Sequence, residues 1–145
     1  MPMASEYRDA GASQPIKNVG VYYLSPVHIV PNAATKDGAP MVKVVWETDQ
    51  GESVWDNLAI VKGAAFRWGQ LWFGLGEDDY DFPTVDDLAR ACLKKLQVGI
   101  QVYAKIKLEL YNGISGPKVD CYLSPDEGIT MLGVSEQPLD EEVPF

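Results

Sequence analysis

The strongest constraint on the fold is a strict alternation of apolar and polar residues between Val98 and Tyr111. Every second position is apolar: Val98, Ile100, Val102, Ala104, Ile106, Leu108 and Leu110. Because successive side chains of a β-strand point to opposite faces, this spacing predicts one long strand with an apolar face turned to a core. We expect the opposite face to be exposed; it carries Gln101, Tyr103, Lys105, Lys107, Glu109 and Tyr111.

The rest of the chain divides into further strands and two helices. Strands are expected at 19–30, with a bend near Ser25-Pro26, at 41–48, at 52–58 and, after a turn at 112–116, at 117–123. Apolar residues recur at helical spacing in residues 64–75 and 85–96, and Thr84 provides an N-cap for the second helix. This order predicts a mainly β, α+β fold: a five-stranded OB-fold-like barrel with a two-helix segment between strands 3 and 4. Other small α+β folds share the same order.

The charge is distributed unevenly over three expected regions. We expect a flexible N-terminal arm at 1–17, a single OB-like domain at 18–125 and an acidic tail at 126–145. The whole chain has a net charge of −9, yet the tail region holds six acidic residues and no basic one. The remainder has 15 acidic and 12 basic residues, a net of −3. A local basic face on the folded part is therefore permitted but not required.

Motifs for catalysis, metals and cofactors are not found in the sequence. His28 is the single histidine, and Cys92 and Cys121 lie in apolar patterns, so we read both as buried free thiols. No nucleophile with a base, no P-loop and no dinucleotide fingerprint is present. The sequence predicts a protein that is not an enzyme and uses no metal or cofactor. With no apolar run that could span a bilayer and no signal-type stretch, we expect a cytoplasmic protein.

Aromatic and basic residues alternate on the outward positions of the expected strands. Trp46, Trp68 and Trp72 instead fall on apolar faces and are expected in the core. Exposed rings stack with bases for about 1–3 kcal/mol each, and lysines meet phosphates, so this pattern predicts a sequence-tolerant single-strand binding face. Tyrosine on exposed strands and lysine at sheet edges are also common without any such function. The predicted face comprises Lys43, Trp55, Tyr103, Lys105, Lys107, Tyr111, Lys118 and Tyr122.

The last residues combine acidic charge with an apolar end. Carboxylates precede an apolar group in the run Asp140, Glu141, Glu142, Val143, Pro144 and Phe145. Such a segment cannot fold alone, and it is typical of a docking peptide whose charges steer it to a basic surface while the ring fills a pocket. It resembles the C-terminal tip of bacterial and phage single-stranded DNA-binding proteins. The alternative is a solvated tail with an incidental phenylalanine.

Residues 19–125 are also similar to a family of phage-encoded single-stranded DNA-binding proteins with an OB-like fold. The similar features are Lys36-Asp37-Gly38 before the second strand, Asp56-Asn57-Leu58 in the third, and the turn at Asn112-Gly113. The resemblance implies DNA binding without sequence preference during bacteriophage DNA replication or recombination. It also implies recruitment of replication and recombination proteins through the tail. The protein would then act in the host cytoplasm, and the resemblance allows a homo-oligomer. Only residues 124–137 separate barrel and tip, which limits the reach of the tail.

One competing hypothesis belongs to another class. A net charge of −9 suits an acidic DNA-mimic or adaptor protein that binds a host nucleic-acid enzyme. Such a protein has no affinity for oligonucleotides even at low salt.

Overall fold

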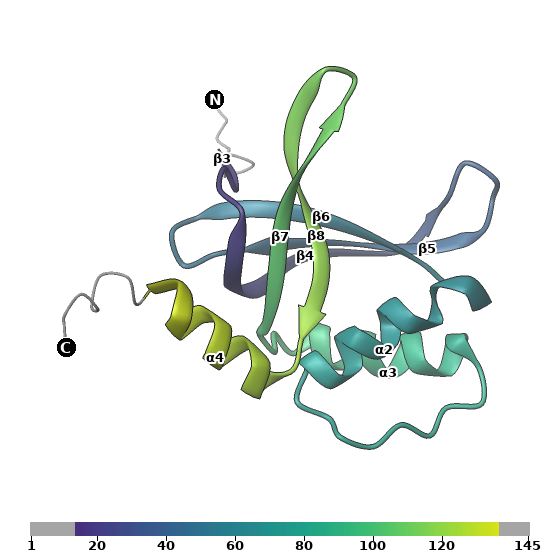
Figure 1. The fold of residues 1–145 in the computed structure, drawn as a ribbon. Helices are drawn as coiled ribbons and strands as arrows, with labels where there is room; N and C mark the ends of the chain where they lie inside the picture. The colour runs from purple at the N-terminus through teal and green to yellow at the C-terminus, as the bar shows by residue number, and fades with distance from the viewer. Residues whose placement is uncertain (1–13, 137–145) are drawn as a thin grey trace.

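The computed structural model describes residues 14–136, except the side chains of Tyr111 and of residues 133–136. The described part has a mixed α+β fold in which a six-stranded, nearly closed, barrel-like sheet is accompanied by three α-helices (Figure 1). The strands are β3 (Gln14–Pro15), β4 (Gly20–Ala34), β5 (Pro40–Glu47), β6 (Glu52–Ala59), β7 (Val102–Tyr111) and β8 (Ile114–Leu123). The helical elements are the 3₁₀ turn η1 (Lys62–Ala64) and the helices α2 (Ala65–Gly74), α3 (Val85–Gln97) and α4 (Pro125–Glu136).

The long strand β4 joins the two halves of the sheet. Its first part, Gly20–Leu24, pairs antiparallel with β7, and its later part, from Ser25 onward, pairs antiparallel with β5. The register shifts between Pro26 and His28, so the bend expected near Ser25-Pro26 is confirmed as a bulge inside one strand. In the strand order β3-β6-β5-β4-β7-β8, contacts between β6 and β8 bring the two halves together and nearly close the barrel.

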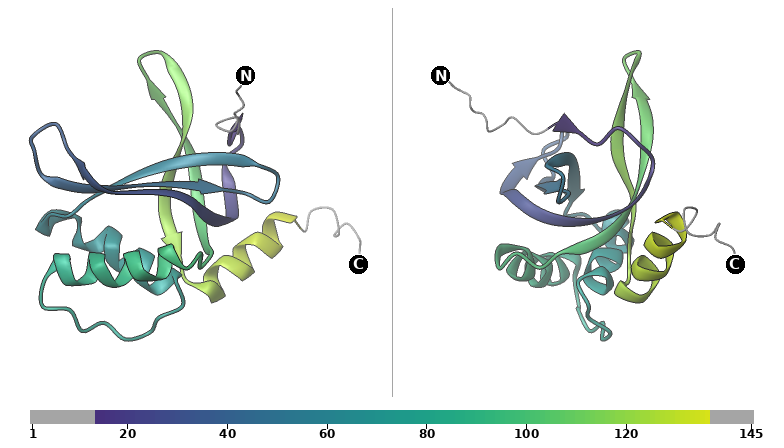
Figure 2. Two further views of the ribbon diagram at one scale, coloured as in Figure 1. Left: turned by 180° about the vertical axis from the view of Figure 1, so that it is seen from behind. Right: turned by 90° about the vertical axis from the view of Figure 1, so that its left-hand side faces the viewer.

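Helices α2 and α3 pack side by side beneath the barrel (Figure 2). The Thr84 side chain accepts a hydrogen bond from the Asp87 amide, which confirms the expected N-cap of α3. Gly74 lets α2 approach the sheet closely, because a Cβ there would lie 3.0 Å from the Leu123 carbonyl oxygen. The tryptophans expected in the core are buried: Trp46, Trp68 and Trp72.

The core face predicted from strand parity is correct in the middle of β7 and wrong at both ends of the predicted strand. Val102, Ala104 and Ile106 are buried, as predicted. Val98 precedes the strand and is 75% exposed, because it lies where the chain leaves α3. Leu110 is 69% exposed because the β7–β8 hairpin extends beyond the part of the sheet that covers the core (Figure 1).

In β8 a bulge reverses the predicted faces. Lys105 pairs with Cys121 while Ile106 pairs with Val119, so Asp120 is an extra residue in the ladder. After this bulge Tyr122 turns into the core and Cys121 turns outward. The prediction that Tyr122 belongs to the exposed face is therefore wrong; its side chain is only 4% exposed.

Two expected boundaries also differ. Gln14–Pro15 pairs in parallel with β6 and Ile16 is buried in the core, so the fold begins within the expected arm. Residues 126–136, expected as the start of a tail, belong to α4, which packs against β4, β7 and β8. None of the helices in the described range is long and apolar enough to cross a membrane.

Candidate nucleic-acid interface

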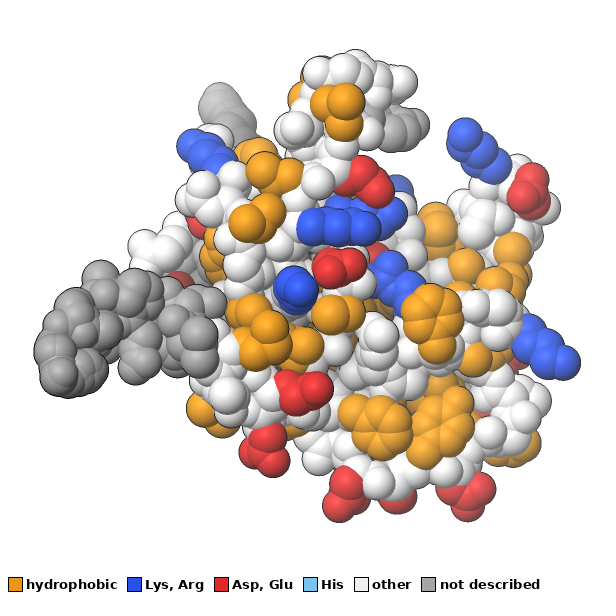
Figure 3. Space-filling view, viewed as in Figure 1, with side chains coloured by type: hydrophobic (Ala, Val, Ile, Leu, Met, Phe, Trp, Pro, Cys, Tyr) orange, Lys and Arg blue, Asp and Glu red, His pale blue; other side chains and the backbone are white. Residues whose placement is uncertain are grey.

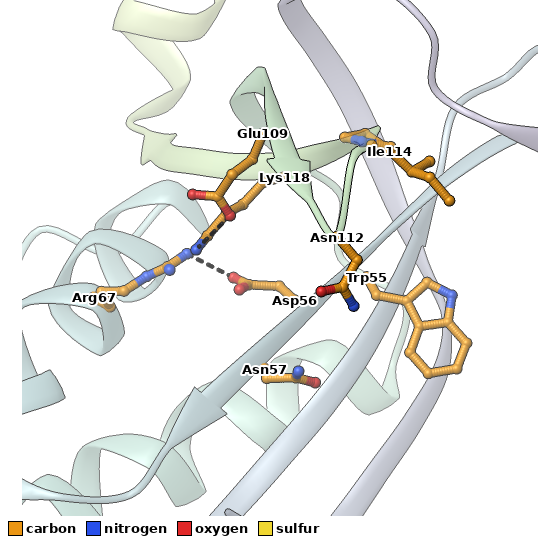
Figure 4. A pocket seen from close by; sticks show the side chains of 10 residues that line it. Trp55, Asp56, Asn57, Arg67, Glu109, Asn112, Ile114 and Lys118 are labelled. Atoms are coloured by element: carbon orange, nitrogen blue, oxygen red, sulfur yellow. Dashed lines mark hydrogen bonds and ion pairs between the residues drawn. The ribbon is translucent and has the colours of Figure 1, made fainter.

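A groove of about 560 Å³ lies between β6, the start of α2 and the projecting β7–β8 hairpin. Trp55 extends at one end, Arg67 reaches in from α2 at the other, and Asp56 lies between them (Figure 4). This volume falls within the range of about 300–1,000 Å³ that is usual for small-ligand pockets. The groove is thus large enough for one base and its sugar-phosphate. Its lining is Trp55, Asp56, Asn57, Arg67, Glu109, Asn112, Ile114, Gly116, Pro117 and Lys118.

Trp55 provides the aromatic surface of the groove. It pairs with Val45 in the β5–β6 ladder and points away from the core, so 57% of its surface is exposed, as the strand parity predicted. The Nζ atom of Lys43, on the neighbouring strand, lies 5.2 Å from the ring centroid. A cation at this distance is attracted by the ring, which at an exposed site contributes about 0.5–1 kcal/mol. The contact therefore favours this position of the ring while its face stays accessible.

A buried polar network forms the floor of the groove. Asp56 occupies a core-facing position of β6 and is only 5% exposed. Its Oδ2 accepts a hydrogen bond of 2.7 Å from Arg67 Nη2 and a second one from the Tyr122 hydroxyl. The Tyr122 oxygen in turn accepts a hydrogen bond of 3.1 Å from Trp46 Nε1. The groove is thus connected to the centre of the core through three side chains.

Burial controls the ionisation of this network. Loss of hydration raises the pKa of the Asp56 carboxyl above its usual value, although the Arg67 charge and the Tyr122 hydrogen bond oppose the rise. Burial and the nearby Asp56 carboxylate raise the pKa of Tyr122 well above its usual value. The hydroxyl of Tyr122 therefore remains a donor to Asp56 across the physiological range.

Most of the basic side chains near the groove have acidic partners. Besides the Arg67 pair, Lys118 Nζ lies 3.3 Å from Glu109 Oε1, and Lys107 Nζ lies 3.8 Å from Asp120 Oδ1. Figure 3 shows basic and acidic side chains intermixed beside exposed apolar groups on this face. Within residues 14–136, the predicted lysines that form no ion pair are Lys43 and Lys105.

The predicted face is divided rather than continuous. Trp55, Lys43 and Lys118 come together at the groove, whereas Tyr103 lies under α4 and is half-buried. Gly128 of α4 packs against the Tyr103 ring, and the Tyr23 ring lies 4.3 Å from it on the neighbouring strand. Of the other predicted residues, Lys105 and Lys107 are exposed and Tyr122 lies in the core. The side chain of Tyr111 and the whole of Asp140–Phe145 lie outside the described part.

Several groove residues were not selected from the sequence. Arg67 is not among the predicted residues, yet only 20% of its side chain is exposed and it forms an ion pair with Asp56. A signal was present in β6: Asp56 has the same parity as Val54 and Leu58, which are core residues. A carboxylate at a core position requires a buried partner. The sequence of β6 could not show that this partner is Arg67, because Arg67 lies on α2, which is a separate element.

The described residues contain no group of three or more histidine, cysteine, aspartate or glutamate side chains placed to hold a metal ion. Comparison of the sequence with models of protein families and with curated proteins finds no match. The chemistry of the groove is therefore the basis for any functional assignment.

Proposed function

We propose that the protein binds single-stranded DNA without sequence preference, as a binding protein rather than an enzyme. The observation that carries this proposal is Trp55, an exposed ring in a groove that also presents Arg67 and Lys118. Base stacking on such a ring contributes about 1–3 kcal/mol and tolerates every base. The amide side chains of Asn57 and Asn112 add hydrogen-bonding groups along the same groove.

The position of the groove supports an OB-type assignment for the barrel. Leaving aside the short β3, the first long strand, β4, is shared by both halves, and the third and fifth, β6 and β8, meet where the barrel closes. This order is consistent with a partly open, five-stranded Greek-key barrel, in which strands 2 and 3 and the adjoining loops bind oligonucleotides. The groove lies on β6, the third long strand, beside the turn of the β7–β8 hairpin. On this proposal α4 and β3 are additions to the barrel.

The acidic segment Asp140–Phe145 completes the proposal as the element that recruits replication or recombination proteins. It lies outside the described residues, so its support is chemical: three carboxylates beside an apolar Val-Pro-Phe group. A basic pocket on a partner matches that combination. Deletion of 140–145 should abolish capture of such partners while leaving oligonucleotide affinity unchanged or slightly higher, because a competing polyanion is removed. Unchanged capture would contradict this role.

The competing hypothesis of an acidic DNA mimic has two observations in its favour. The net charge is −9, and Lys107, Lys118 and Arg67 are each paired with a carboxylate. A mimic presents acidic groups to a nucleic-acid enzyme and has no affinity for DNA itself.

A fluorescence titration with labelled oligo-dT at low salt decides between these functions. The wild-type chain should bind, and Trp55→Ala should bind about 5- to 150-fold more weakly, the ratio that 1–3 kcal/mol of lost stacking gives. Phe66→Ala is the matched control, because Phe66 is 66% exposed on α2 and does not line the groove. Absence of wild-type binding would favour the mimic. Equal weakening by the two substitutions would remove the groove from the proposal.

A further inference from the structure

Arg67 differs from the other cations near the groove in being held rigidly. Its side chain is 20% exposed, whereas that of Lys118 is 45% exposed. Its backbone is fixed by the next residue, Trp68, which is fully buried and donates a hydrogen bond of 2.9 Å to the Ala59 carbonyl. The backbone that carries this guanidinium is therefore held by the core.

The guanidinium is also oriented by its hydrogen bond to Asp56. Asp56 binds Nη2 at 2.7 Å, and Asp56 is itself held by the Tyr122 hydroxyl, which is anchored on Trp46. The Cζ atom of Arg67 lies 5.9 Å from the centre of the Tyr122 ring. The network thus restrains the direction of the guanidinium, so less side-chain entropy remains to be lost on binding a ligand.

The hydrogen-bonding capacity of Arg67 is not exhausted by these contacts. A guanidinium has five N–H donors, and within the described residues Asp56 takes one of them, on Nη2. The Nε atom is buried and out of reach of a ligand, so the donors that remain for one are those of the two terminal nitrogens. The side chain lines the groove, on the opposite side of Asp56 from Trp55 (Figure 4). A planar fork with unused donors matches the oxygens of a phosphate group.

We infer that Arg67 is the phosphate-binding residue of the groove and that Asp56 and Tyr122 are its positioning residues. This inference rests on the proposed function: one phosphate of the strand lies against Arg67 while a neighbouring base lies on Trp55. Lys118 is a second, mobile charge that has to leave Glu109 to reach the strand. Asp56 offsets part of the positive charge of Arg67 but holds the guanidinium at the groove.

The salt dependence of oligo-dT binding by the full chain tests the role of Arg67. Affinity for single strands falls with salt at a slope of about 0.7 per neutralised phosphate. Arg67→Gln should reduce the slope by less than about 0.7, because Asp56 already offsets part of the Arg67 charge, and should weaken binding about tenfold or more. Arg90→Gln is the matched control, since Arg90 is 74% exposed on α3 and is not among the groove residues; its slope should equal that of the wild type.

Two conservative variants separate positioning from charge. Arg67→Lys keeps the charge and loses the fork, so the slope should stay near the wild-type value while the affinity falls. Tyr122→Phe keeps the Arg67 charge but removes a hydrogen bond that holds Asp56, so the same pattern is expected under conditions in which circular dichroism shows the variant to be folded. If Arg67→Gln does not fold, Arg67→Lys decides, and wild-type affinity in that variant would overturn the inference.

The outcomes distinguish this inference from the function on which it rests. Failure of the wild-type chain to bind oligo-dT at any salt concentration contradicts the proposed function. Binding that Trp55→Ala weakens, together with identical slopes for Arg67→Gln and Arg90→Gln, leaves the proposed function in place and overturns the phosphate role alone. It would then identify the Arg67–Asp56 pair as a structural contact.

Discussion

Removal of the Tyr122 hydroxyl should destabilise the fold strongly. The ring of Tyr122 is 4% exposed, and its oxygen accepts from Trp46 Nε1 at 3.1 Å and donates to Asp56. Tyr122→Phe leaves a buried N–H without an acceptor and a buried carboxylate with one donor fewer. Each unmet buried group costs about 1–3 kcal/mol, and Asp56 keeps its bond to Arg67, so we expect a loss of about 2–4 kcal/mol in the free energy of unfolding.

Urea denaturation followed by far-UV circular dichroism measures this loss. Tyr22→Phe is the matched control, because the Tyr22 hydroxyl donates a single exposed hydrogen bond of 2.8 Å to the Asn18 carbonyl. That variant should lose about 0.5–1 kcal/mol. A double-mutant cycle of Tyr122→Phe with Asp56→Asn should show a coupling free energy well above zero. Equal stabilities for Tyr122→Phe and Tyr22→Phe would refute the network as a source of stability.

Three further expectations follow from burial. Burial raises the folded-state pKa of Asp56 above its unfolded value of about 4. The contribution of Asp56 to the free energy of unfolding is therefore present below about pH 4 and is lost as the pH rises through the folded-state pKa. Asp56→Asn should remove this pH dependence in urea titrations at a series of pH values. Gly128→Ala should lower stability by about 1–3 kcal/mol, measured by thermal unfolding, because the added Cβ overlaps a tyrosine ring of β7, whereas Gly116→Ala, with open space around it, should not. A thiol reagent at pH 8 should modify half-buried Cys121 in the folded protein but Cys92 only after unfolding, because Cys92 is buried and desolvation raises its pKa to about 12; rapid labelling of both thiols would contradict the packing of α3.

The sequence predicted the elements because their signals are local. Alternation located β7, the Thr84 cap located the start of α3, and helical spacing placed Trp68 in the core. These features depend on backbone geometry and on burial of one face, which a short stretch of sequence already encodes. The barrel-like sheet followed from their order, although residues 14–136 form six strands and three helices where five strands and two helices were expected.

The errors arose where tertiary contacts decide. A period of two cannot reveal the extra residue Asp120, so Cys121 and Tyr122, which follow it, were placed on the wrong faces. The helix α4 has only a weak division into apolar and polar faces, and its acidic first turn was read as the start of a tail. The prediction of the site residues was incomplete for the same reason. Trp55 was found from parity alone, whereas Arg67 required knowledge of which helix faces Asp56.

The pairing of cations with carboxylates bears on how a chain of net charge −9 can select single strands. Duplex affinity depends mainly on phosphate neutralisation. Asp56 stays bound to Arg67 and offsets part of its charge, and Lys107 and Lys118 can neutralise phosphates fully only by exchanging a carboxylate partner. That exchange reduces the electrostatic gain for duplex and single strand alike. Stacking on Trp55 is available only to bases that are not already stacked and paired, so it remains for the single strand alone. On the proposed function, the acidic residues around the groove therefore lower total affinity and raise the preference for unpaired DNA.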